Sequence, residues 1–200
     1  MTKSMNKIEK LIAKLCPNGV EFKELAKVCD IADNKRRHVK SSLRVPGETP
    51  YYGANNIQDY VEGFTHDGDY VLIAEDGSAS LENYSIQYAE GKFWANNYVH
   101  VIQGKDELNN RFLFHYFRSM NFVPFLSGGT RVKLTKAKML EIKIPIPPLA
   151  EQERIVAILD KFDALVNDIS IGLPAELNAR RKQYEYYRDK LLTFNEYVKQ

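Results

Sequence analysis

Residues 144–162 read IPIPPLAEQERIVAILDKF and place three prolines directly before a well-patterned amphipathic helix. Proline fixes φ and lacks an N–H, so Pro145 suits an edge or terminal strand position, whereas Pro147 and Pro148 suit the residues just before a helix. The stretch therefore predicts a strand that runs through a rigid junction into a helix. We expect such a junction where a helix must leave a globular body in a defined direction.

The helix that follows the prolines carries an apolar stripe. Its apolar residues recur at alternating steps of three and four, the heptad spacing with which one helix packs along another. After SIGLP the stripe resumes, and a stutter at Gly172 and Pro174 permits a bend there. We predict one long, kinked helical rod over residues 148–195 that forms an antiparallel coiled coil, in preference to a helical hairpin. The stripe consists of Ile155, Phe162, Leu165, Ile169, Leu177, Tyr184, Tyr187 and Leu191.

Length and composition limit the remaining possibilities. With 200 residues, 44% hydrophobic and 12% aromatic, the chain can bury one sizeable core and an appended element. The formal net charge is only +2, so bulk charge does not require a polyanionic partner and local patches must decide. Cys16 and Cys29 lack metal-type pairing, and no stretch suits a signal peptide or membrane span. We expect a soluble cytoplasmic protein with no membrane partner.

The chain before the prolines contains two regions with different sequence patterns. Residues 1–15 place apolar side chains at helical spacing, and CPNGV then stops the predicted N-terminal helix. Residues 16–147 alternate short apolar runs with Gly, Asn and Asp clusters, which predicts short strands, with one helix near residues 109–120. The predicted fold class is therefore an α/β (α+β) domain followed by the C-terminal helical rod.

Catalytic patterns are weak. A DNA methyltransferase would need a Gly-rich cofactor loop after a strand and an Asn- or Asp-Pro-Pro-aromatic loop, and the sequence contains neither. Asp76 with Glu90 and Lys92 loosely resembles the carboxylate and lysine set of metal-dependent nucleases, although ordinary turn and strand-edge residues produce such sets by chance. Ser78 and Ser80 suit turns. The histidines lack metal-ligand spacing, so we expect them to be solvated or hydrogen-bonded and predict no metal site.

Binding patterns are stronger. Residues 34–44, NKRRHVKSSLR, are densely basic, and a second basic set follows the flexible turn SGGT at residues 127–130. Cations suit a phosphate backbone, the glycines could bring backbone N–H groups close to it, and asparagines can pair with adenine edges. Each pattern alone is more typical of a solvated face or a turn, so both interpretations remain open. The candidate DNA contacts are Lys35, Arg36, Arg37, Lys40, Arg44, Asn55, Asn56, Gly128, Gly129, Thr130, Arg131 and Lys133.

Five segments carry a resemblance to a known family. FLSGGTRVKLTKAKMLEIKIPIPPLAEQERIVAILDKFDALVNDI resembles the end of a target-recognition domain and the start of the helical spacer in specificity subunits of type I restriction-modification systems. KLCPNGVEFKELAKVC resembles the opening of such a domain, PYYGANNIQDYVEG and GKFWANNYVHVI its interior, and GLPAELNARRKQYEYYRDKLL the distal half of the spacer. Full subunits of this family carry two recognition domains and two spacers, whereas this chain resembles one of each. A half-length subunit and a piece of a longer one both remain open.

The resemblance implies a noncatalytic role. In the family, a recognition domain reads one half of a bipartite DNA target, and spacer helices pair antiparallel to set the distance between the halves. Modification (methyltransferase) subunits bring S-adenosylmethionine, and restriction subunits complete the complex. For this chain the resemblance implies no cofactor of its own, double-stranded DNA as ligand, and a homodimer through the C-terminal helices. A stand-alone nuclease using Asp76, Glu90 and Lys92 and a protein-only interaction module remain as alternatives.

Overall fold

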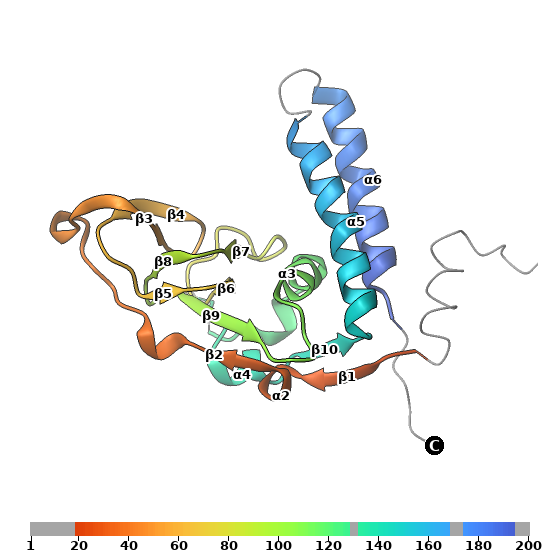
Figure 1. Ribbon diagram of the computed structural model, residues 1–200, viewed down its shortest axis with the longest axis horizontal. Helices are drawn as coiled ribbons and strands as arrows, with labels where there is room; N and C mark the ends of the chain where they lie inside the picture. Colours follow the sequence, from red (N-terminus) through yellow and green to blue (C-terminus); the bar gives the residue numbers. More distant parts are fainter. Residues whose placement is uncertain (1–18, 129–131, 169–173, 195–200) are drawn as a thin grey trace, which may run out of the picture. The chain divides into compact units, whose positions relative to one another are not determined.

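The computed structural model describes residues 19–128, 132–168 and 174–194 (Figure 1). The predicted N-terminal helix over residues 1–15 lies outside this part of the chain. The chain divides into two units: Glu24–Lys143, which we call the α/β unit, and Met1–Lys23 with Ile144–Gln200, which we call the helical unit. Among the described helices, none combines the length and the apolarity that crossing a bilayer requires.

Two four-stranded sheets form the α/β unit. The first is antiparallel throughout, in the order β2-β9-β6-β7. The second has the order β4-β3-β8-β5, and its neighbours β3 and β8 run parallel. The mixed α/β character of this unit agrees with the prediction. The strands are β2 (Cys29–Ile31), β3 (Pro46–Tyr52), β4 (Ile57–Val61), β5 (His66–Asp67), β6 (Tyr70–Ala74), β7 (Ile86–Ala89), β8 (Lys92–Ala95) and β9 (Val99–Gly104).

Strand β6 lies at the centre of the core. All five of its residues, YVLIA, are buried, as a strand covered on both faces requires. Tyr70 and Leu72 join an apolar cluster with residues of β8 and β9, among them Phe93 and Val101. Helix α3 (Asn110–Ser119) also packs on this sheet, against β6, β7 and β9. Each fully buried large apolar side chain contributes about 1.5–3 kcal/mol to folding.

Helix α3 confirms the helix predicted near residues 109–120. Asn109 caps it, because its side-chain oxygen accepts hydrogen bonds from the backbone N–H groups of Arg111 and Phe112. Its aromatic face is buried, and Phe112 and Phe117 are at most 1% exposed. The remaining short elements of the unit are α2 (Leu25–Val28), η1 (Asp33–Lys35), η2 (Ser41–Leu43), η3 (Val123–Phe125) and α4 (Lys136–Leu140).

The proline junction has the predicted form. Strand β10 (Lys143–Ile146) pairs with β1 (Glu21–Glu24) in a two-stranded sheet, so Pro145 occupies an edge strand, and helix α5 (Leu149–Asp168) begins directly after Pro148. The buried Gln152 side chain donates to the Pro147 carbonyl at 2.8 Å. The Pro148 carbonyl accepts from the backbone N–H of Gln152 at 3.1 Å. These bonds fix the first turn of α5 to the prolines.

The C-terminal region is a helical hairpin, so the prediction of one long, kinked rod is wrong. Helix α6 (Pro174–Leu192) lies beside α5 (Figure 1). The ring of Phe162 stacks on Tyr187 with centroids 5.7 Å apart, whereas residues at this sequence separation in one continuous helix would lie about 37 Å apart. The heptad pattern located an apolar face but not the helix that covers it. Pro174 begins α6, a position that proline favours.

The hairpin uses only part of the predicted stripe. Ile155, Tyr184 and Leu191 are buried, whereas Leu165 is 49% exposed. Ile169 and the side chain of Leu177 lie outside the described residues. The apolar stripe is therefore partly covered within the chain itself.

A double-mutant cycle between Phe162 and Tyr187 tests the hairpin. Because the rings are in contact, Phe162→Ala and Tyr187→Ala should be non-additive in the free energy of unfolding by about 0.5–1.5 kcal/mol. Urea unfolding of the wild type, the two single variants and the double variant, monitored by the helical circular dichroism signal, measures this coupling energy. Phe162→Ala with Tyr60→Ala, a residue of β4, is the matched control and should be additive. A coupling near zero, or one that vanishes on dilution, would contradict an intrachain hairpin.

Candidate nucleic-acid interface

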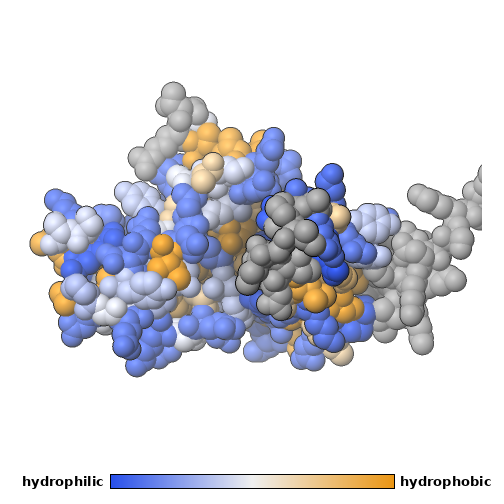
Figure 2. All heavy atoms as spheres, turned by 90° about the horizontal axis from the view of Figure 1, so that it is seen from above, coloured by the Kyte–Doolittle hydropathy of each residue, from blue (hydrophilic) through white to orange (hydrophobic). Residues whose placement is uncertain are grey.

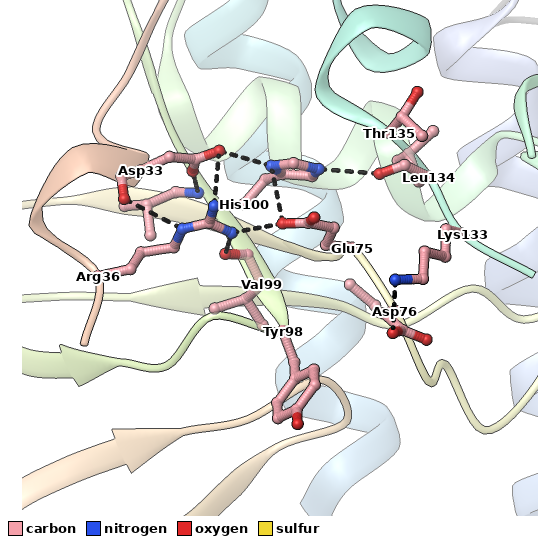
Figure 3. Close-up of polar contacts among 12 residues, drawn as sticks. Asp33, Arg36, Glu75, Asp76, Tyr98, Val99, His100, Lys133, Leu134 and Thr135 are labelled. Atoms are coloured by element: carbon pink, nitrogen blue, oxygen red, sulfur yellow. Dashed lines mark hydrogen bonds and ion pairs between the residues drawn. The ribbon is translucent and has the colours of Figure 1, made fainter. Parts of the chain in front are cut away.

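Arg36 anchors an ionic network inside the α/β unit (Figure 3). Its Nη1 donates to Glu75 Oε2 and to the Val99 carbonyl, both at 2.7 Å. Its Nε donates to the Asp33 carbonyl at 3.1 Å, and its Nη2 lies 3.4 Å from Asp33 Oδ2. Only 15% of the Arg36 side chain is exposed. This guanidinium therefore has a structural role that the sequence did not reveal.

His100 completes the network. Its Nδ1 lies 2.7 Å from Asp33 Oδ2, and its Nε2 lies 2.9 Å from the Leu134 carbonyl oxygen. Burial acts to raise the pKa of Asp33, but hydrogen bonds from His100 and from the Val101 N–H, together with the charges of His100 and Arg36, outweigh it and lower that pKa. An ionised carboxylate and a carbonyl only accept hydrogen bonds, so both ring nitrogens of His100 face hydrogen-bond acceptors. The expectation of a hydrogen-bonded histidine is confirmed here.

The network brings the two basic segments together. The Glu75 carbonyl accepts from the Leu134 N–H at 2.9 Å, and Lys133 Nζ lies 3.3 Å from Asp76 Oδ2. Ser127 and Lys133 exchange two backbone hydrogen bonds of 2.8 Å. Gly128 has φ of +109°, a conformation that favours glycine. Gly129, Thr130 and Arg131 lie outside the described residues.

The predicted cations divide into two groups. Lys35, Arg37 and Lys40 are exposed. Arg36 and Lys133 are ion-paired as described, and Arg44 pairs with Asp59 at 3.3 Å while its Cζ lies 4.0 Å from the centroid of the Tyr51 ring. The exposed group retains the character of a phosphate-binding surface, and the paired group holds loops in place. Whether any of them contacts DNA stays a prediction.

The two adjacent asparagines also differ. Asn55 Nδ2 donates to the Gly77 carbonyl at 2.8 Å, and its Oδ1 accepts from the Ala79 N–H at 2.7 Å, so Asn55 fixes the turn after β6. Asn56 is exposed, and its Oδ1 accepts from the Ile57 N–H at 2.8 Å. The predicted turn role of Ser78 is confirmed, because its hydroxyl donates within that turn.

The sequence interpretation missed a pocket of about 430 Å³ on the α/β unit. The segment RFLFHYFRS (residues 111–119) has the pattern of a helix that packs in the core, so the sequence did not indicate a binding role for Arg111 and Arg118. Their spacing of seven residues, which places both on one face of a helix, was the available signal. The lining includes Asn56, Gln87, Tyr88, Arg111, Phe114 and Arg118.

The structure does not favour the nuclease alternative, because two of its residues, Asp76 and Glu90, lie far apart. In the antiparallel pair of β6 and β7, Ile73 faces Ile86 and Tyr70 faces Ala89. Glu90 therefore follows one end of the pair, and Asp76 follows the other. The separation is about 15–20 Å at roughly 3.3 Å per residue, whereas carboxylates that share a cation each approach it to about 2.0–2.6 Å.

Residues 17–179 match a protein family described as the type I restriction modification DNA specificity domain. The chain belongs to this family. A curated protein of Haemophilus influenzae, named as a type I restriction enzyme specificity subunit, is 62% identical over 181 residues, which cover 88% of this chain and 47% of that protein. The chain thus spans about half the length of this specificity subunit.

Solved structures of type I specificity subunits share the fold. The S subunit of M. genitalium superposes with a TM-score of 0.62 at 18% identity, covering 76% of this chain and 41% of that one. The S subunit of Thermoanaerobacter tengcongensis gives a TM-score of 0.56 at 20% identity, covering 92% of this chain and 49% of that one. Each matched region is about half of a specificity subunit or slightly less.

The two neighbouring arginines should behave differently on substitution. Arg36→Ala removes the guanidinium that pairs with Asp33 and Glu75, and should lower the free energy of unfolding by on the order of 3 kcal/mol. Arg37→Ala removes an exposed side chain of the same type, and should stay within about 0.5 kcal/mol of the wild type. Urea unfolding of both variants measures the difference. Equal stability of the two variants would show that the network contributes little.

Proposed function

We propose that this chain supplies DNA sequence specificity to a type I restriction-modification complex and reads one half of a bipartite target. The family match over residues 17–179 carries the proposal. The α/β unit supports it, because the ionic network brings together two basic segments that are separated in the sequence. Exposed Lys35, Arg37 and Lys40 would contact phosphates, which position a protein on the duplex but carry no sequence information.

The role of the chain in this proposal is noncatalytic. Modification subunits would bring S-adenosylmethionine and dock beside it, and restriction subunits would complete the complex, so the chain itself would hold no cofactor. The separation of Asp76 from Glu90, which follow opposite ends of the β6–β7 pair, supports this assignment over a nuclease. Hydrophilic residues cover most of the face of the α/β unit in Figure 2, with apolar residues in small separate patches. Such a face suits a wet, polar interface with DNA.

The helical unit is proposed as the spacer. Leu165 and Tyr186 are 49% and 52% exposed on its two helices, and they offer apolar surface to a second hairpin. Two copies joined in this way form a homodimer with twofold symmetry, which implies an inverted-repeat target with an unread gap. In a longer chain, a second spacer on the same polypeptide would take the partner's place.

Duplex binding without cleavage tests the proposed function. The full chain should bind a fluorescent 30-base-pair duplex of mixed sequence with an affinity that falls steeply between 50 and 200 mM salt, because phosphate contacts release counterions. Arg37→Ala with Lys40→Ala should reduce the slope by about 0.9 per lost contact. Magnesium-dependent cleavage by the chain alone would instead support an enzyme. Absence of duplex binding, with retained capture of a purified modification subunit, would favour the protein-only module.

Sedimentation at micromolar concentration tests the spacer. The wild-type chain should sediment as a dimer, and Leu165→Asp with Tyr186→Asp should give monomers because charges enter the apolar contact. Ala164→Asp is the matched control, since it places the same charge at an exposed neighbouring position of α5, and it should remain dimeric. A monomeric wild-type chain would contradict the homodimer.

A further inference from the structure

The pocket missed by the sequence interpretation combines cations, amides and aromatic rings. The chain segment after β3, strand β7 and helix α3 form its walls. Two arginines, Arg111 and Arg118, line it together with amide and aromatic side chains. Guanidinium groups present planar sets of N–H donors that match the geometry of phosphate oxygens.

Aromatic rings hold both guanidinium groups. Arg111 Cζ lies 4.8 Å from the centroid of Tyr88 and 4.9 Å from that of Phe114, and Arg118 Cζ lies 5.3 Å from the Phe114 centroid. These distances fall within the range of about 6 Å for cation–π contacts. A guanidinium that is already stacked loses less conformational entropy when it binds a ligand.

The spacing of the two arginines suits an extended anion. Seven residues of α-helix correspond to two turns and about 10.5 Å. This distance is about three base pairs of duplex DNA at roughly 3.4 Å each. Successive phosphates of a DNA strand extend over such a length, so one strand can engage both side chains.

The chain segment after β3 adds amide groups that are held in place. Gln87 Nε2 donates to the carbonyl oxygens of Gly53 and Ala54 at 3.3 and 3.2 Å. Asn55 follows Ala54, and its Nδ2 donates to the Gly77 carbonyl oxygen at 2.8 Å, which anchors this segment to the turn after β6. The exposed Asn56 amide at the pocket therefore follows a backbone segment that hydrogen bonds hold in place, and the Asn56 carbonyl itself accepts from the Gly53 N–H at 2.9 Å, as a base-reading side chain requires.

The pocket continues from the basic segments. Asp76, which pairs with Lys133, directly precedes the turn that Asn55 holds. Asn56 follows Asn55 and lines the pocket. A run of neighbouring groups thus leads from Lys133 to the arginines of α3.

We propose that this pocket is a DNA-contact surface, in which Arg111 and Arg118 bind phosphates of the target duplex and Asn56 reads a base edge. The inference rests on the proposed function and assigns it residues outside the two basic segments. Phosphate contacts by the arginines would set the register of the duplex, and the Asn56 amide is suited to a bidentate pair with adenine.

Salt-dependent binding tests the two arginines. The full chain with Arg111→Gln and Arg118→Gln should bind the same 30-base-pair duplex with a slope of log affinity against log salt that is smaller by about 1.8. The matched control is Lys27→Gln with Lys105→Gln, which removes two exposed cations of the same unit outside the pocket. Its slope should remain close to the wild-type value. Thermal unfolding verifies that each variant is folded.

The outcomes separate this inference from the function on which it rests. If the wild-type chain binds duplex and the folded arginine variant has an unchanged slope, the pocket is not a phosphate-contact surface and the proposed function stands. If the wild-type chain binds no duplex, both fail. Asn56→Ala should leave the slope unchanged and relax the base preference at one position of the methylated half-site, as mapped in cells. An unchanged half-site would overturn the base-reading role.

Discussion

The hydrogen bond between Asp33 and His100 is the contact on which the arrangement of the two basic segments, and so the proposed binding surface of the α/β unit, depends. Buried charges are tolerated in proteins only when they are paired, and here Asp33, Arg36, Glu75 and His100 satisfy one another. The bonds reach from η1 to the end of β6, to β9 and to the Leu134 carbonyl. Segments that are far apart in sequence are thereby held as one surface. A polar network of this kind favours one arrangement of the loops, because any other would leave buried groups unsatisfied.

Local rules made several elements predictable from the sequence. Proline chemistry located the junction between β10 and α5, and an aromatic-rich segment located α3. The roles of individual arginines were not predictable in this way. Arg36 and Arg37 are adjacent and chemically identical, but only Arg36 meets Glu75, which is 39 residues away in the sequence. The packing of the strands determines such long-range partners. They cannot be predicted from a run of basic residues in the sequence.

The C-terminal helices show a second limit of sequence patterns. A heptad stripe predicts that an apolar helix face will be buried against a partner. The stripe has the same sequence pattern whether that partner is the next helix, another copy of the chain or another protein. Here α6 supplies part of the cover through Tyr184 and Tyr187. The consequence for a spacer is quantitative. A hairpin reaches only as far as one helix, about 30 Å for the 20 residues of α5, which is about half the reach of the continuous rod.

The distribution of charge suggests why reading one half of a target would need a spacer. The chain has a formal net charge of only +2, and Arg36, Arg44 and Lys133 are engaged in internal ion pairs. Because phosphate neutralisation supplies most of the nonspecific affinity for DNA, one α/β unit of a chain with nearly balanced charge should bind weakly. Linking two such units makes the second binding event intramolecular and raises the overall affinity without any new contact, provided that the linker matches the distance between the half-sites. A spacer with fixed geometry would thus convert two weak half-site contacts into binding that requires both half-sites at a set distance.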